Sequence, residues 1–187
     1  YKLQWLDRSS ISVSFSDVFI QLLAPFDPTN TSGDTLATGS RHRWQSGKIS
    51  YRSTPKRLFT YTLTGSYGGF FNGTLLSLDA IINYRVQPYG SLAMVATINR
   101  VLLPLPYNSA DLILIGPRLD ITFTDQLFLT TFVQYNNQIN NLNINMRFQW
   151  RYAPVSDLFI VYTDNYLPSP FSTKNRALVA KLSYWFN

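Results

Sequence analysis

Hydrophobic and polar residues alternate without exception in segment 141–152, NLNINMRFQWRY. Its even positions, from Leu142 to Tyr152, are apolar or aromatic, and its odd positions, from Asn141 to Arg151, are polar or charged. Successive side chains of a β-strand point to opposite faces, so the pattern predicts a strand with one apolar and one polar face. Its length is about twice that of a usual globular strand and is close to what a tilted strand needs to cross a bilayer.

Similar alternation recurs along the chain and predicts about eleven strands. Segment 126–136 has no clean parity, so its facing stays open. The predicted strands cover approximately residues 1–6, 11–23, 40–53, 58–67, 76–86, 91–103, a stretch ending at Phe123, 126–136, 141–152, 157–164 and 176–186.

The predicted connections also alternate along the chain. Short turns are expected near 54–57, 87–90, 124–126 and 153–157, and mostly longer links at 24–39, 70–73, 104–110, 136–141 and 165–174. Outer-membrane β-barrels have short periplasmic turns and longer external loops, so we expect a transmembrane antiparallel barrel. Because bacterial single-chain barrels have an even number of strands, at least one strand is expected before Tyr1. Residues 1–187 would then be the C-terminal portion of a longer barrel.

Alternation alone does not say whether the apolar face points outward to lipid or inward to a core. A soluble β-sandwich or lipocalin-like barrel is therefore the alternative. Charged residues make up 14% of the chain, against about 25% in a typical soluble domain. All ten acidic residues are Asp, and Cys is absent. The low charge favours the membrane interpretation, and the lack of Glu, a good helix former, disfavours helices.

The net charge of +6 does not indicate nucleic-acid binding, because the basic residues are scattered and form no stripe or motif. Parity instead places a set of basic residues on the polar, lumen-facing side, against Asp79 and Asp120. This set either gives the lumen a preference for anions or forms lumen ion pairs, such as Arg85 with Asp79 and Arg118 with Asp120. The predicted lumen-facing basic residues are Lys48, Arg52, Arg85, Arg118, Arg147, Arg151 and Lys181.

Four aromatic residues lie near the predicted periplasmic strand ends, where an interfacial girdle is expected. They are Trp150, Tyr152, Tyr184 and Trp185.

Catalysis is not expected. His42 is the only histidine, and neither Ser40 nor Ser46 lies in a nucleophile motif. The scattered Asp residues have no metal-ligand spacing, so neither a metal nor another cofactor is expected.

Several segments resemble the C-terminal barrel region of a Bacteroidota protein family that pairs an N-terminal domain similar to family-nine carbohydrate-binding modules with a C-terminal domain of unknown function. The resemblance runs from about residue 11 to the end and is most specific from 133 onward. It implies a barrel in the bacterial outer membrane and carries no catalytic residues. The segments are PFDPTN (25–30), GGFFNG (68–73), QPYGSL (87–92), VQYNNQINNLNINMRFQWRYAPVSDLFIVYTDNY (133–166) and KNRALVAKLSYWFN (174–187).

The last predicted strand also resembles the signal recognised by the barrel-assembly machinery. Polar Lys181 is followed by aromatic Tyr184 and Phe186, although Ser183 stands where Gly is common and Asn187 follows the last aromatic residue. The expected partners are therefore outer-membrane lipid, the assembly machinery and other subunits of an outer-membrane complex.

Two functions follow from this interpretation. The barrel is a pore or gated channel for a small anionic or saccharide solute, or it is a closed barrel that anchors a binding module or serves as a subunit of a transport or secretion complex. A lumen plug would separate the two, and residues 24–39 are the longest candidate for one.

The predicted facing is testable by moving one charge between neighbouring positions. Phe148→Arg should impair stability or membrane assembly far more than Gln149→Arg, because charge on the lipid face near the midplane costs about 2–4 kcal/mol. Folded yield in liposomes measures both variants. Equal yields would refute the assignment of Phe148 to the lipid face.

Overall fold

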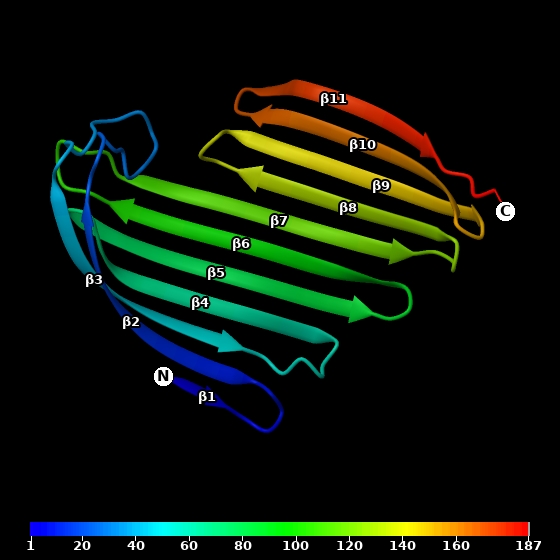
Figure 1. The fold of residues 1–187 in the computed structure, drawn as a ribbon, viewed down its shortest axis with the longest axis horizontal. Coiled ribbons are helices and arrows are strands. Elements are labelled where there is room, and N and C mark those ends of the chain that lie inside the picture. Colours follow the sequence, from blue (N-terminus) through cyan, green and yellow to red (C-terminus); the bar gives the residue numbers. More distant parts are fainter. Residues whose placement is uncertain (187) are drawn as a thin grey trace. The chain divides into compact units, whose positions relative to one another are not determined.

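The computed structural model describes residues 1–186 as one open antiparallel sheet, with its strands in sequence order from β1 to β11 (Figure 1). No described residue lies in a helix, and hence none belongs to a helix that could cross a membrane. The strands are β1 (Lys2–Gln4), β2 (Ser10–Gln21), β3 (Arg41–Arg52), β4 (Phe59–Phe70), β5 (Gly73–Val86), β6 (Gly90–Leu102), β7 (Ala110–Thr122), β8 (Leu127–Asn136), β9 (Asn141–Ala153), β10 (Ser156–Pro168) and β11 (Phe171–Leu182).

The prediction of an all-β antiparallel fold with about eleven strands is confirmed.

The chain forms two compact units. The first contains Tyr1–Ile81 and Ala96–Ile113, and the second contains Ile82–Val95 and the residues from Leu114 onward. Closure of the sheet and its insertion into a membrane stay predictions.

In the first unit, the register places polar and apolar rows on opposite faces. Ser12, Ser50 and Thr64 are cross-strand neighbours on β2, β3 and β4, and the Ser50 and Thr64 hydroxyls are hydrogen-bonded at 2.8 Å. The adjacent row on the other face contains Ile11, Tyr51 and Leu63. Because facing residues in a sheet share a side, this register extends the alternation of each strand across three strands.

In the second unit, β8 to β11 show the same two faces. One row contains Leu129, Phe148, Ile160 and Ala180, all apolar. The pairing also settles the facing of β8, which the sequence left open. Its odd residues, such as Leu129, share the apolar face, and its even residues share the polar face.

An asparagine ladder crosses the polar face of the second unit. Asn143 donates to Asn165 at 2.6 Å, and Asn165 donates to Asn175 at 2.5 Å. The three residues are cross-strand neighbours on β9, β10 and β11. Each amide is therefore held by its neighbour, and the polar face is fixed by side chains as well as by backbone pairing.

One ion pair lies on the apolar face of the second unit. Asp164 is a cross-strand neighbour of both Ile144 and Arg176. Its side chain is completely buried and lies 2.7 Å from the Arg176 guanidinium. The hydroxyls of Tyr162 and Tyr166 donate to the same carboxylate oxygen at 2.6 and 2.5 Å. Hydrogen bonds from three side chains thus offset part of the cost of burying this charge, while the other carboxylate oxygen, Oδ1, is buried without a hydrogen-bond partner among the described residues.

Two of the predicted longer links are wrong. Segment 70–73 is a tight turn at Phe71 and Asn72, and segment 165–174 is mostly strand, with only Ser169 and Pro170 between β10 and β11. At the first turn, Phe71 has φ 53°, a left-handed conformation more usual for Gly or Asn. At the second, β10 and β11 stay paired up to Pro168 and Phe171, and the stacked rings of Tyr166 and Phe171 lie 5.0 Å apart beside the turn.

The last strand is also shorter at its C-terminal end than predicted. β11 ends at Leu182, so Tyr184, Trp185 and Phe186 follow the strand rather than continue its alternation. Asn187 lies outside the described residues. The Ser183 backbone still exchanges hydrogen bonds with Asp157 at 2.9 and 3.2 Å, which ties this segment to the start of β10.

Two glycines of the first unit offer a matched test of backbone packing. A Cβ added at Gly73 would overlap the carbonyl oxygen of Leu102, whereas a Cβ at Gly47 meets nothing within 4 Å. We expect Gly73→Ala to lower the free energy of unfolding by about 1–3 kcal/mol. Gly47→Ala should change it by less than about 1 kcal/mol, in either direction. Urea unfolding in detergent micelles, followed by tryptophan fluorescence, measures both, and equal effects would contradict the close approach at Gly73.

Candidate functional site

The polar face of the first unit carries two of the predicted basic residues. Lys48 lies between Ser14 and Ser66, and Arg52 lies between Ser10 and Thr62. Both side chains are exposed. Because the neighbouring hydroxyl side chains are short, the charged groups of Lys48 and Arg52 are accessible to solvent or to a solute.

The polar face of the second unit carries both paired and unpaired cations. The Arg118 guanidinium lies 3.0 Å from the Asp120 carboxylate, which confirms the predicted ion pair. The Arg151 guanidinium lies 3.6 Å from Asp157 and 5.9 Å from the centre of the Phe128 ring. The sequence did not predict that second pair.

Two other predicted cations of this unit have no counter-charge. Arg147 is a cross-strand neighbour of Thr130 and Val161, and Lys181 of Phe159. Neither forms an ion pair within residues 1–186. Asp79 accepts a hydrogen bond from Thr97 at 2.8 Å, and its predicted pairing with Arg85 of β5 stays a prediction.

The long connection between β2 and β3 folds into an ordered loop, residues 22–40. A backbone bridge joins Phe26 to Leu36. Inside this bridge, the Asp27 carboxylate accepts hydrogen bonds from the Thr29 hydroxyl at 2.6 Å and from the backbone N–H groups of Thr29, Thr31 and Gly33 at 2.8, 2.9 and 3.3 Å. The Asp27 carboxylate is therefore the centre of a hydrogen-bond network inside the loop.

An aromatic cluster fastens this loop to the sheet. Phe71 contacts Phe26 of the loop at a ring-centre distance of 5.3 Å, and it contacts Trp44 and His42 of β3 at 5.0 and 5.4 Å. In β3, the even residues His42 and Trp44 share the face of Lys48. The loop thus lies over the polar face of the first unit, at the end where β2 leaves the sheet.

A second connection supports the same loop. Asn108, between β6 and β7, donates from its side chain to the Thr31 hydroxyl at 3.2 Å, and the two loops lie together in Figure 1. Among the described residues, the buried hydrophobic side chains are Leu22, Leu36, Val101 and Leu103. The most protected apolar packing is therefore at these loops and at the adjoining end of β6, where Val101 lies.

His42 contacts Ser40 at the end of the loop. The Ser40 hydroxyl lies 2.9 Å from His42 Nε2, and it donates to the carbonyl of Ala37 at 2.7 Å. A hydroxyl has one proton, so the bond to Ala37 competes with donation to His42, and the donor in the His42 contact depends on the tautomer of the ring. No cluster of three metal-ligating side chains occurs in the described part of the chain.

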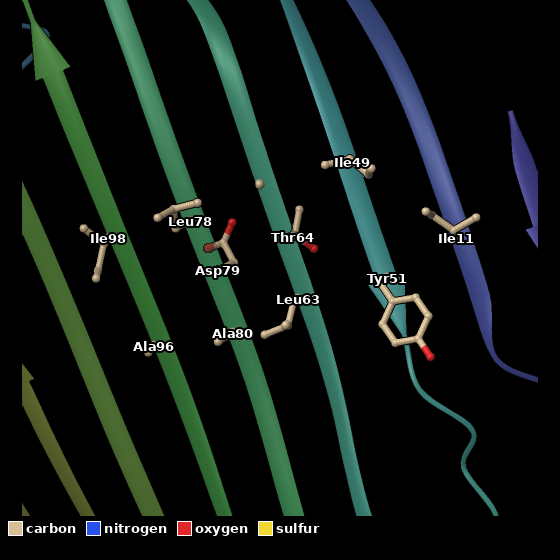
Figure 2. A pocket seen from close by; sticks show the side chains of 11 residues that line it. Ile11, Ile49, Tyr51, Leu63, Thr64, Leu78, Asp79, Ala80, Ala96 and Ile98 are labelled. Atoms are coloured by element: carbon tan, nitrogen blue, oxygen red, sulfur yellow. The ribbon is translucent and has the colours of Figure 1, made fainter.

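The apolar face of the first unit contains a hollow of about 450 Å³ (Figure 2). Its centre is open because Gly65, Ala80 and Ala96 have little or no side chain. Larger apolar residues of β2 to β6, such as Ile49 and Ile98, surround it. A hollow with these walls offers contacts to hydrocarbon and almost no hydrogen-bonding group.

Aromatic residues gather at the strand ends that border the predicted short turns, such as 54–57 and 153–157. We call these the turn ends of the strands. The rings of Trp150 and Tyr152 lie 5.9 Å apart, and the Tyr152 hydroxyl donates to the Ser183 carbonyl at 2.8 Å. A cluster that the sequence did not single out joins Phe59, Tyr61 and Tyr51, with ring centres 5.7 and 5.8 Å apart.

No family model, curated protein or solved structure matches the chain.

Sequence reasoning missed two groups of polar residues. Lys2 was not assigned to the lumen because β1 is too short to show alternation. The Asp17–Arg43 pair, at 2.7 Å, lies at odd positions of β2 and β3, on the face of Phe15 and Ile49. The signal available in the sequence was one acidic and one basic residue at otherwise apolar positions of neighbouring strands, which indicates an ion pair between them.

Acid should loosen the loop through Asp27. Burial alone would raise the pKa of this carboxyl, but the hydrogen bonds from Thr29, Thr31 and Gly33 outweigh burial and lower the pKa to about 2. The ionised form therefore stabilises the loop fully above the unfolded pKa of about 3.9, and this contribution is lost as the pH falls towards 2. Hydrogen exchange of residues 22–40, corrected for intrinsic rates, should rise between pH 4 and 2.

Two substitutions in the loop separate this effect from general acid unfolding. Asp27→Asn should already increase exchange of the loop at pH 7, and Asp34→Asn should leave it unchanged, because the Asp34 side chain is exposed. If Asp27→Asn exchanged like the parent protein, the hydrogen bonds to Asp27 would not be what holds the loop.

Proposed function

We propose that the chain is β-barrel sequence of a bacterial outer-membrane protein, and that its polar face lines a pore for a small anionic or saccharide solute. The observation that carries the proposal is an apolar face with large exposed side chains. Phe15, Tyr67 and Leu178 lie on apolar rows and are 70%, 63% and 70% exposed. Contiguous apolar surface of this kind associates in water, whereas a bilayer requires it.

Strand length supports the same proposal. The strands from β2 to β11 contain ten to fourteen residues each. A tilted transmembrane strand needs about 9–11 residues, so each is long enough to span the hydrocarbon region.

An open sheet edge is not tolerated in lipid, because its backbone groups would have no partners. We therefore include closure in the proposal.

The unpaired cations support a preference for anions. Lys48 and Arg52 in the first unit, and Arg147 and Lys181 in the second, lie on polar faces without a carboxylate partner in the described structure. Fixed cations along a pore raise the local concentration of anions. The asparagine ladder adds amide groups that can hydrogen-bond a neutral polar solute.

The loop supports a second candidate, a closed barrel that anchors a binding module or serves as a subunit of an outer-membrane complex. Residues 22–40 lie over the polar face of the first unit and are fixed by buried Leu36 and by the Phe26–Phe71 contact. A loop held in this way reduces the open cross-section of the proposed pore.

Planar-bilayer recordings of the full-length protein test the pore. We expect stable conductance with anion preference. Arg147→Gln should lower the anion-to-cation permeability ratio by a factor of about two to five, the effect of losing about 0.5–1 kcal/mol of attraction. Arg151→Gln is the matched control and should have a smaller effect, because Asp157 already offsets the charge of Arg151.

Replacing residues 25–37 by a short Gly-Ser linker separates the two candidate functions. Larger conductance after the replacement would identify the loop as a constriction of a working pore. If folded protein conducts neither with the loop nor without it, the pore proposal fails and the anchoring role remains.

A further inference from the structure

We propose that a hollow in the polar face of the first unit, where β1, β2 and β3 meet, binds an oxyanion of the size of inorganic phosphate. The hollow has a volume of about 150 Å³ and is lined by Lys2, Ser10, Ser12, Ser50 and Arg52. Binding there does not require a pore, but a role for the site in solute passage rests on the proposed function.

The register explains why a hollow forms. Lys2, Ser12 and Ser50 form one cross-strand row, and Ser10 and Arg52 belong to the next row on the same face. The three serine side chains are short, whereas those of Lys2 and Arg52 are long, and all five line the hollow. Alternation along the strands therefore brings two cations and three hydroxyl groups to one place on the same face.

The lining offers many donors and no acidic group. An ammonium has three N–H donors and a guanidinium has five in a planar fork that matches an oxyanion. Ser50 shares a hydrogen bond with Thr64 at 2.8 Å, while the Ser10 and Ser12 hydroxyls have no side-chain partner within the described residues. These hydroxyls can turn their protons toward a bound oxygen.

No carboxylate of the described chain neutralises this site. Arg43, Arg118, Arg151 and Arg176 each have an Asp within 4.0 Å, but neither Lys2 nor Arg52 does in residues 1–186. The Asp7 carboxylate in the β1–β2 turn accepts hydrogen bonds from the backbone N–H and hydroxyl of Ser9, and it does not line the hollow. Two like charges around one small hollow repel each other, and an anion between them removes that repulsion.

The size of the hollow limits what fits. A volume of about 150 Å³ leaves room for one small oxyanion together with bound water. The hollow lies beside the start of β2, whereas the loop of residues 22–40 follows the end of β2. The loop therefore does not cover the hollow.

Titration of the folded full-length protein with inorganic phosphate, by isothermal calorimetry or ³¹P NMR, tests the site. We expect Lys2→Gln and Arg52→Gln each to weaken phosphate binding at least about tenfold, because each removes charge-assisted hydrogen bonds. Arg41→Gln is the control. It removes the same charge from β3 but lies at the other end of that strand, outside the hollow, and it should change the affinity less than twofold.

The outcomes separate this inference from the pore proposal. Absence of phosphate binding to the parent protein, or equal weakening by all three substitutions, would overturn the site. Site-dependent binding in a protein that does not conduct would retain the site and refute the pore. Conductance with no phosphate binding would retain the pore proposal and overturn the phosphate site.

Discussion

The structure depends on the two-residue period of its strands being kept in register from one strand to the next. Ser12, Ser50 and Thr64 form a polar row, and Ile11, Tyr51 and Leu63 form the apolar row beside it. A slip of one residue between two such strands would move every serine among the isoleucines and leucines. The polar face, its cations and the proposed anion site all follow from this one alignment.

The two ends of the strands are built differently. At the turn ends, aromatic rings such as Tyr51 and Trp150 border the apolar face. At the opposite end of the first unit, Leu36 and Leu103 are buried under the loops, and Asp27 organises the longest loop from within. The loop is thus a small packed element with its own polar and apolar contacts, and its stability can respond to acid separately from the sheet.

The sequence was sufficient to predict the strands because their alternation is a local property. It also identified the polar-face residues such as Arg147 and the Arg118–Asp120 pair. Its failures came from contacts between segments. Phe71 makes a tight turn because its ring packs on Trp44 and Phe26, and the β10–β11 hairpin extends to Pro168 beside the ion pair of Asp164. The facing of β8 followed only from its pairing with β9, and Lys2 joined the polar face only through its pairing with Ser12.

The ion pair between Asp164 and Arg176 solves a problem that alternation leaves open. A shift of β11 by two residues against β10 keeps apolar side chains opposite apolar side chains, so face matching cannot reject it. A shift in one direction would place Leu178 opposite Asp164, and the buried carboxylate would lose the guanidinium that now lies 2.7 Å away. A shift in the other direction would place Lys174 there, whose single ammonium cannot reproduce the two contacts that the Arg176 guanidinium makes to the carboxylate. The ion pair therefore favours the observed alignment of the last strand over both shifts.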